Sequence, residues 1–424
     1  MKVYLRTFGC RANHYDTEAV RELVESNGHA IAASVDDADV AVFNSCAVTS
    51  EAEAELRKVV RRAGRDRPGL RSVVMGCAAA LDDERPTQTS IRALPTVERV
   101  VAGADLTAIA DALDLRAVDS RILTRAQSGS RALLRVQDGC DEHCTFCATT
   151  MARGANRSRP IDDIVREART LAERHREIVI TGIHIGTYGA DIGSSLSRLM
   201  ERLVRDVHGA RFRLTSIEAT EIDPLLFDLI ADPSADVVPH VHAPLQSGSN
   251  RLLRRMGRHW YTAESYASAV ERLAESCDVL GLGADIITGF PGESAEDHAA
   301  TIALVHRLPF TYLHVFPFSL RPGTPAERLP DQVEPMLAHE RARELRELAG
   351  AKSAAYQASR AGGRADVIAI GPPRAGGREG LTEDYLTVGV HDPAVARGER
   401  FEARLVVGAT GLVAARDLSL SRAV

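Results

Sequence analysis

The sequence lacks the long apolar segments of a membrane protein. No run of about eighteen apolar residues occurs in its 424 residues. The first ten residues, MKVYLRTFGC, predict a strand rather than a basic and apolar leader. Aromatic residues make up only 4% of the chain, although 45% of the residues are hydrophobic and supply an ample core. We therefore expect a cytoplasmic protein with two or three globular domains.

The chain also lacks an excess of positive charge, since its formal net charge is −6. This charge opposes non-specific attraction to nucleic acid, so an RNA site would need a local basic patch. The seven cysteines point to metal binding or catalysis rather than to disulfides, because a reducing compartment does not keep disulfides.

Three of these cysteines, Cys140, Cys144 and Cys147, form the motif GCDEHCTFC at the end of a predicted strand. A four-iron cluster needs four ligands, so three cysteines leave one iron open for a substrate or cofactor. The alternative is a zinc site, completed by His143. Zinc sites usually pair CxxC with a second CxxC or HxxxH, so the spacing favours an iron–sulfur cluster.

Three further cysteines, Cys10, Cys46 and Cys77, each end an apolar run in the first 115 or so residues. Helical periodicity over 14–28 and 49–64 separates these runs, which predicts a βαβαβ unit with a parallel sheet. The cysteines would then lie at the carboxyl ends of neighbouring strands, where ligands of open α/β sheets bind. We interpret them as a second cluster site; three ordinary buried cysteines are the alternative.

The remainder of the chain predicts two further domains. Strand patterns at 133–139, 177–182, 211–218, 237–246, 282–290 and 311–319 alternate with helical stretches and predict a partial (β/α) barrel. Its active site would lie at the carboxyl ends of the strands. The last 65 or so residues predict a small β-barrel, which either binds nucleic acid or serves as an oligomerisation or lid module. The expected domains are 1–117, 131–350 and 351–424, with a linker at 118–130.

The six cysteines and four further segments, ARGANRSRP, VITGIHIGTYG, PLQSGSNRLLRRMGR and ADIITGFPGE, resemble the radical S-adenosylmethionine (SAM) methylthiotransferase family over the whole chain. The resemblance implies an α/β protein with an N-terminal cluster domain, a radical SAM barrel and a TRAM-like C-terminal β-barrel. The segments TFGCRANHYDTE, NSCAVTSEAE, YLHVFPFSLRPGTPA and GLTEDYLTV are most similar to the branch that acts on threonylcarbamoyladenosine.

This resemblance implies insertion of a methylthio group at C2 of N6-threonylcarbamoyladenosine 37 in tRNA. One SAM would donate the methyl group, and a second would be the source of the 5′-deoxyadenosyl radical, with two 4Fe-4S clusters as cofactors. Expected partners are the tRNA anticodon stem-loop and an electron donor such as flavodoxin or ferredoxin, while the sulfur source stays open. The alternatives are a ribosomal protein aspartate or isopentenyladenosine in tRNA as acceptor, or a non-catalytic iron–sulfur protein that binds RNA.

Two sets of side chains are candidates for the remaining contacts. Residues at predicted strand ends and beside the cluster loop are expected to bind SAM: Phe146, Thr181, Gly182, His184, Glu218, Gln246, Ile286 and Gly289. Two arginine-rich segments are expected to meet tRNA phosphates: Arg153, Arg157 and Arg159 in the first, and Arg251, Arg254, Arg255 and Arg258 in the second. The leftover Cys277 is predicted to be a small buried apolar residue.

Overall fold

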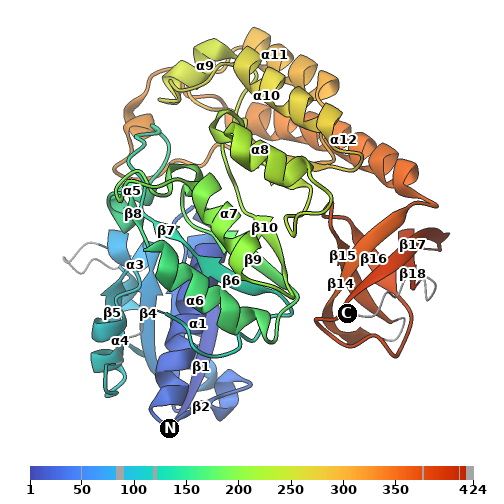
Figure 1. The fold of residues 1–424 in the computed structure, drawn as a ribbon. Coiled ribbons are helices and arrows are strands. Elements are labelled where there is room, and N and C mark those ends of the chain that lie inside the picture. The colour runs from blue at the N-terminus through green and yellow to red at the C-terminus, as the bar shows by residue number, and fades with distance from the viewer. Residues whose placement is uncertain (49, 83–89, 118–121, 375–376, 410, 417–424) are drawn as a thin grey trace.

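The computed structural model describes residues 1–48, 50–82, 90–117, 122–374, 377–409 and 411–416. Positions 118–121 of the predicted linker and 417–424 at the end of the predicted C-terminal domain lie outside the described residues. Figure 1 shows an N-terminal sheet in blue, a central layer of strands and helices, and a C-terminal barrel in red. None of the helices in these ranges is long and apolar enough to cross a membrane.

The N-terminal part is a five-stranded parallel sheet in the order β2-β1-β3-β4-β5. Its strands are β1 Lys2–Thr7, β2 Ala30–Ile31, β3 Val40–Ser45, β4 Arg71–Gly76 and β5 Val97–Ala102. Every residue of the central strand β3 is buried, as expected for a parallel sheet covered on both faces. The predicted βαβαβ unit is therefore confirmed.

Four helices accompany this sheet: α1 Arg11–Ser26, α2 Ser50–Asp66, α3 Cys77–Leu81 and α4 Leu106–Ala112. Helix α1 lies between the sheet and the central part of the molecule (Figure 1). Its apolar side chains, such as Val20 and Leu23, pack into the N-terminal core. Polar residues of the same helix are buried against the central domain instead, and Tyr15 donates to Glu167 at 3.0 Å.

The central part contains six parallel strands in two sheets, β10-β9-β6 and β11-β12-β13. Bridges from Phe212 to Val237 and from Ser216 to His242 connect the sheets into one partial barrel. The strands are β6 Ala132–Arg135, β9 Glu177–Thr181, β10 Arg211–Leu214, β11 His240–His242, β12 Gly281–Thr288 and β13 Tyr312–Pro317. All six predicted strands are present, and the predicted partial barrel is confirmed.

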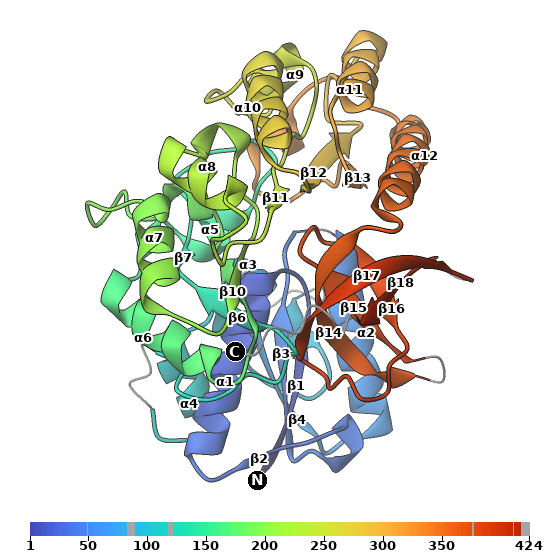
Figure 2. The ribbon, with the colours of Figure 1, turned by 45° about the vertical axis from the view of Figure 1, so that its right-hand side comes forward.

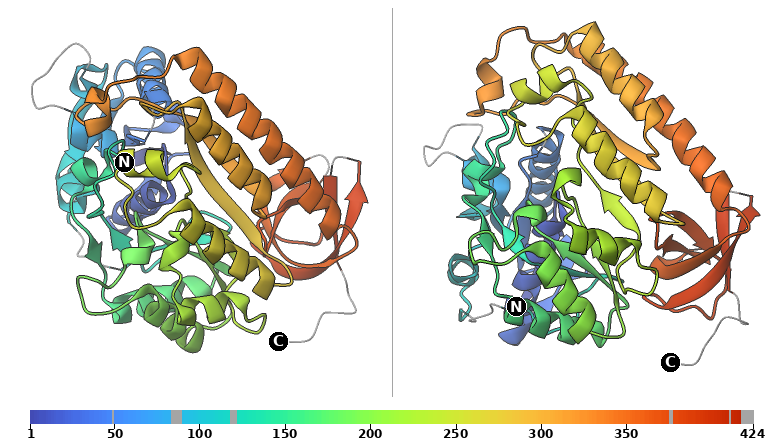
Figure 3. Two further views of the ribbon diagram at one scale, coloured as in Figure 1. Left: turned by 90° about the horizontal axis from the view of Figure 1, so that it is seen from above. Right: turned by 45° about the horizontal axis from the view of Figure 1, so that its top comes forward.

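Helices cover the outer face of the partial barrel, and Figure 3 shows α10, α11 and α12 running side by side. The helices are α6 Ile161–Ala172, α7 Leu196–Asp206, α8 Pro224–Ala231, α9 Asn250–Arg255, α10 Ala263–Ser276, α11 Ala295–Arg307 and α12 Pro335–Arg360. Short elements surround the cluster loop: β7 Gln137–Asp138, α5 Thr149–Arg153 and β8 Arg157–Ser158. The largest hydrophobic core lies between the strands and these helices.

The C-terminal part is a closed five-stranded barrel in the order β14-β15-β16-β18-β17. Its strands are β14 Arg364–Arg374, β15 Gly377–Thr382, β16 Thr387–Val390, β17 Arg400–Gly408 and β18 Gly411–Arg416. The small β-barrel predicted from the sequence is confirmed. Figure 2 shows it beside both the N-terminal sheet and the partial barrel, and Arg11 accordingly donates to Tyr385 Oη at 2.8 Å.

The turn after β15 closes the amino-terminal end of the partial barrel. Gly281, at the start of β12, permits this approach, because a Cβ there would lie 2.1 Å from the Asp384 carbonyl oxygen. The next residue, Tyr385, adopts a φ of 72° and stacks on His240 with ring centroids 4.4 Å apart. The turn after β15 therefore covers the amino-terminal ends of β11 and β12.

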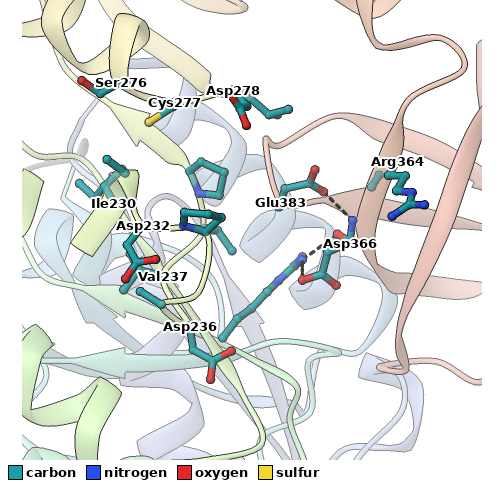
Figure 4. Close-up of a pocket in the computed structure, with 18 of the residues that line it drawn as sticks. Ile230, Asp232, Asp236, Val237, Ser276, Cys277, Asp278, Arg364, Asp366 and Glu383 are labelled. Carbon is teal, nitrogen blue, oxygen red and sulfur yellow. Dashed lines mark hydrogen bonds and ion pairs between the residues drawn. The ribbon is translucent and has the colours of Figure 1, made fainter. Parts of the chain in front are cut away.

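A cavity of about 460 Å³ lies between the partial barrel and the C-terminal barrel. Figure 4 shows Asp366 and Glu383 on the C-terminal barrel facing Asp232, Asp236 and Cys277 on the central part. Cys277 packs against the large hydrophobic core as predicted, but it is half-buried rather than fully buried because it lines this cavity.

Candidate two-cluster site

The cysteines of the N-terminal sheet converge at its carboxyl edge. Cys10 follows β1, Cys46 follows β3 and Cys77 begins α3 directly after β4. Gly9 has a φ of 95°, and a Cβ there would lie 2.5 Å from Cys46 Sγ, so only glycine admits the thiol against this turn. The sequence-based expectation of a shared edge matches this geometry.

Asn13 lies beside two thiols of this group, which we call the N-terminal triad (Cys10, Cys46 and Cys77). Its Oδ1 is 3.6 Å from Cys10 Sγ and 3.8 Å from Cys77 Sγ. Its Nδ2 donates to the carbonyls of Phe8 and Ser45 at 3.0 and 2.7 Å. Because those carbonyls belong to the ends of β1 and β3, Asn13 fixes the two strand ends relative to the thiols.

The barrel triad (Cys140, Cys144 and Cys147) lies in the loop between β7 and α5. The Cys140 backbone N–H donates to the Gly154 carbonyl at 3.1 Å, which closes the loop at its base. Gly139 has a φ of 73°, and a Cβ there would lie 1.9 Å from the Ala155 carbonyl oxygen. A side chain at position 139 would therefore force the base of the loop open.

Charged side chains surround the barrel triad. His184 places Nδ1 3.7 Å from Cys140 Sγ and Nε2 2.9 Å from Glu221. Burial disfavours the charge of His184, but its hydrogen bonds with Cys140 and Glu221 outweigh burial and raise its pKa to about 10. Arg258 places Nη1 3.6 Å from Cys144 Sγ and is also paired with Glu218.

Both triads fit an iron–sulfur cluster by donor chemistry. Each offers three free thiols, none of which is paired in a disulfide, and thiolates are the ligands such clusters use. Burial raises the pKa of Cys77 to about 11 and that of Cys144 to about 12, although Arg153 and Arg258 act in the opposite direction. Ligation would therefore displace protons from these thiols, and the nearby cations would offset the resulting negative charge.

Several of the residues predicted to bind SAM lie around the barrel triad. Thr181 ends β9 and Gly182 follows it, and Gly182 approaches Gln137, since a Cβ there would lie 2.8 Å from Gln137 Oε1. Phe146 packs edge-on against Phe290, with ring centroids 6.3 Å apart. His184 contacts Cys140, as described above.

Three further residues predicted to bind SAM, Glu218, Gln246 and Gly289, bond to or pack against other parts of the protein. The Glu218 carboxylate is bound by Arg258. Gln246 has a φ of 63°, and its backbone bonds to Asp285 and Ile287 in β12. Gly289 has a φ of 72° and faces α12, because a Cβ there would lie 2.2 Å from Ala338 Cβ.

Ile286 requires a correction. It is fully buried in the hydrophobic core, whereas the preceding Asp285 bonds to His242 and His314. Since alternate residues of a strand face opposite sides, Ile286 faces the helices and is not available to an adenine ring.

The seven predicted RNA-binding arginines differ in burial: three are largely buried, one is partly exposed and three are exposed. The guanidinium groups of Arg153, Arg159 and Arg258 are largely buried and pair with Asp16, Glu167 and Glu218, respectively. Arg255 donates to two carbonyl oxygens, those of Pro291 and Pro330, and is only partly exposed. The prediction of phosphate contact is wrong for the three buried arginines, because their donors already serve protein acceptors. Arg157, Arg251 and Arg254 are exposed.

Two groups of polar residues were not predicted. Asn13 and Asp16 on α1 contact the cluster region; the sequence signal was their position directly after Cys10, within RANHYD. The second group, His242, Asp285 and His314, offers three ligand atoms within 4.8 Å of one another on neighbouring strands and could hold a metal ion. Asp285 lies 3.0 Å from His242 Nε2 and 3.2 Å from His314 Nδ1, so the three side chains also bond to one another directly.

Comparison with protein families matches two segments of the chain. Residues 2–96 match a family described as Uncharacterized protein family UPF0004, and residues 134–305 match the Radical SAM superfamily. Among solved structures, the chain is similar to the radical S-adenosylmethionine methyltransferase TsrM from Kitasatospora setae, with a TM-score of 0.54. That similarity covers 77% of this chain and 76% of the other at 16% identity, and it concerns the fold.

Curated relatives match more of the chain. The threonylcarbamoyladenosine tRNA methylthiotransferase MtaB of Bacillus subtilis (strain 168) is 35% identical over 363 residues, which cover 81% of this chain and 79% of the relative. The protein of the same name from Aquifex aeolicus (strain VF5) is 32% identical, with 92% and 96% covered. A tRNA-2-methylthio-N(6)-dimethylallyladenosine synthase from Sorangium cellulosum (strain So ce56) is 35% identical, with 89% and 83% covered.

The partial barrel with its cysteine loop defines a radical SAM enzyme, and the three free thiols of the N-terminal triad fit a second cluster. The chain belongs to the family of radical SAM tRNA methylthiotransferases. Its cofactors are two 4Fe-4S clusters and SAM.

Proposed function

We propose that the enzyme inserts a methylthio group at C2 of N6-threonylcarbamoyladenosine 37 in tRNA. The names of the relatives from Bacillus subtilis and Aquifex aeolicus support this acceptor. One observation of the chain supports the chemistry best: helix α5 of the barrel loop packs against α3, which begins with Cys77. A substrate atom between the two triads would therefore be within reach of both.

The two clusters, once bound, would supply reductive cleavage of SAM at the barrel triad and a carrier for sulfur at the N-terminal triad. The chain itself holds the two thiol sets in fixed positions, through Asn13 for one and the Cys140–Gly154 hydrogen bond for the other. We further propose that His184 orients Cys140 and that Glu221 fixes the His184 ring. Candidate SAM contacts are Phe146, Thr181, Gly182, Glu218, Gln246 and Gly289.

The proposal extends to the partners. We infer that the anticodon stem-loop is bound through Arg157, Arg251 and Arg254, which are exposed, together with the C-terminal barrel in a TRAM-like role. A small flavodoxin or ferredoxin would deliver electrons. We also propose a cytoplasmic location, where tRNA is found, and the domain limits 1–117, 131–350 and 351–424. The last limit falls within α12 (Pro335–Arg360), so the C-terminal domain begins with the end of that helix.

The test uses protein reconstituted anaerobically with iron and sulfide, SAM and a strong reductant. Three tRNA substrates are compared: one with threonylcarbamoyladenosine, one with isopentenyladenosine and one with unmodified adenosine at position 37. Mass spectrometry of the digested nucleosides is expected to find the methylthio adduct on the first only. An adduct on isopentenyladenosine alone would refute threonylcarbamoyladenosine as the acceptor and identify isopentenyladenosine as the acceptor instead. Formation of 5′-deoxyadenosine without any adduct would refute the tRNA acceptor and leave SAM cleavage standing.

A further inference from the structure

One buried arginine connects the two cysteine triads. Arg153 ends α5, six positions after Cys147, and therefore belongs to the segment that carries the barrel triad. Its Nε lies 3.2 Å from Cys77 Sγ, a thiol of the N-terminal triad. The two residues are 76 positions apart, so this contact forms only when the domains dock.

The other two nitrogens of the Arg153 guanidinium also donate hydrogen bonds to protein acceptors. Nη2 donates to Asn13 Oδ1 at 2.7 Å and to Asp16 at 2.8 Å, and Nη1 donates to Asp138 at 3.0 Å. Asn13 is the residue that pins the ends of β1 and β3. Asp138 precedes Cys140 by two residues, so one guanidinium bonds to structural elements of both triads.

We propose that Arg153 is a positioning residue that couples the two cluster sites and raises the reduction potential of the cluster held by the N-terminal triad. Hydrogen bonds to the sulfur ligands and local charge both set the potential of an iron–sulfur cluster. A guanidinium that donates to a ligand sulfur stabilises the more negative, reduced form, and the effect is strong where water does not screen it. The side chain of Arg153 is only 2% exposed.

The surrounding charges indicate that Arg153 does not serve only to neutralise nearby acidic side chains. Asp16 and Asp138 both also contact Arg135, which supplies them with a second cation. The acidic side chains therefore do not depend on Arg153 alone. Cys77, in contrast, has Arg153 as its cationic hydrogen-bond donor among the described residues.

The proposal concerns the one-electron reduction of the cluster held by the N-terminal triad. An added chemical reductant supplies the electron, and no bond in the protein is made or broken. The proposal rests on the two-cluster assignment and does not depend on which RNA is the substrate. A failure to methylthiolate a given tRNA would therefore leave it unaffected.

The test is an EPR-monitored potentiometric titration of the two-cluster holoenzyme and of three variants, with dithionite as reductant. Adding SAM changes the spectrum of the cluster that binds it, which separates the two reduced signals. Arg153→Gln is expected to make the N-terminal cluster at least tenfold harder to reduce, a shift of about 59 mV to lower potential. Arg166→Gln is the matched control, because Arg166 is an arginine of the same domain that is 63% exposed and pairs with Asp163 on its own helix, and its potential is expected to equal that of the wild type.

A wild-type potential in iron-loaded Arg153→Gln would overturn the proposal. If this variant does not retain its second cluster, Arg153→Lys decides the question. Lysine keeps the positive charge but lacks the planar set of donors that reaches Cys77, Asp16 and Asp138 together. The potential of Arg153→Lys is therefore expected to fall as well, and an unchanged value would equally overturn the proposal.

Discussion

Glu177 anchors the C-terminal barrel through two buried arginines, and Glu177→Gln is expected to be strongly destabilising. The carboxylate is fully buried at the start of β9. Its Oε1 accepts from Arg213 Nε at 2.9 Å and from Arg131 at 3.1 Å, and its Oε2 accepts from Arg211 Nε at 2.8 Å. Burial alone would raise the pKa of Glu177, but the arginines hold it well below the usual range.

The same arginines bond to the C-terminal barrel. Arg211 donates to the Asp366 carbonyl at 2.7 Å, and Arg213 donates to the carbonyls of Thr382 and Glu383, both at 2.9 Å. Arg211 keeps the Asp366 carboxylate in the variant, whereas Arg213 loses the carboxylate it pairs with. Removing one partner of a buried pair costs about 3–5 kcal/mol, because an uncompensated charge stays buried. That cost equals a change of about a hundredfold or more in the unfolding equilibrium.

Urea unfolding followed by circular dichroism measures this loss, and limited proteolysis reports on the docking of the C-terminal barrel. We expect a clearly lower unfolding midpoint and faster cleavage near the end of α12 in Glu177→Gln. Glu173→Gln is the control, since Glu173 is an exposed glutamate four positions before Glu177 in the sequence. Equal midpoints and equal cleavage rates for wild type and Glu177→Gln would refute the anchoring role.

Three further predictions follow from single positions. Gly139→Ala should open the barrel loop, because a Cβ there would lie 1.9 Å from a carbonyl oxygen. The iron content should then fall from about eight to about four atoms per chain, and full iron content would contradict the account. Arg254→Gln should weaken tRNA binding and reduce the slope of log affinity against log salt by about 0.7–0.9, whereas Arg62→Gln, on an exposed α2 side chain, should leave the slope unchanged. Tyr385→Ala should lower the melting temperature by removing the stack on His240, and a wild-type melting curve would exclude that role for Tyr385.

Strand patterns and cysteine positions made most of the fold predictable. The strands of the partial barrel are apolar runs between helices of clear periodicity, and the cysteines of the N-terminal triad end three such runs. Parallel strands share one edge, so convergence of Cys10, Cys46 and Cys77 followed from topology alone. Strand β5 was not predicted, because its exposed, edge position leaves only Val101 buried and gives no clear alternation.

The tertiary contacts of charged side chains were beyond the reach of sequence patterns. Arg153, Arg159 and Arg258 stand in arginine-rich segments that are typical of a solvated or RNA-binding surface, yet the fold buries Arg153 and Arg258 and covers most of Arg159. Their partners Asp16, Glu167 and Glu218 lie between 8 and 137 positions away. Composition and periodicity report local structure, whereas burial of a charge depends on which distant side chain arrives beside it. The stacking of Tyr385 on His240 could not be predicted for the same reason, because the two residues are 145 positions apart in the sequence.

The most direct test of the two-cluster account compares wild type with Cys46→Ala in one anaerobic reaction containing SAM, reductant and threonylcarbamoyladenosine tRNA. Mass spectrometry quantifies both 5′-deoxyadenosine and the methylthiolated nucleoside, with Cys277→Ala as the control for loss of a thiol outside both triads. The account predicts both products from wild type and control, and 5′-deoxyadenosine without the methylthio product from Cys46→Ala. Wild-type yields of methylthiolated nucleoside from Cys46→Ala would contradict it.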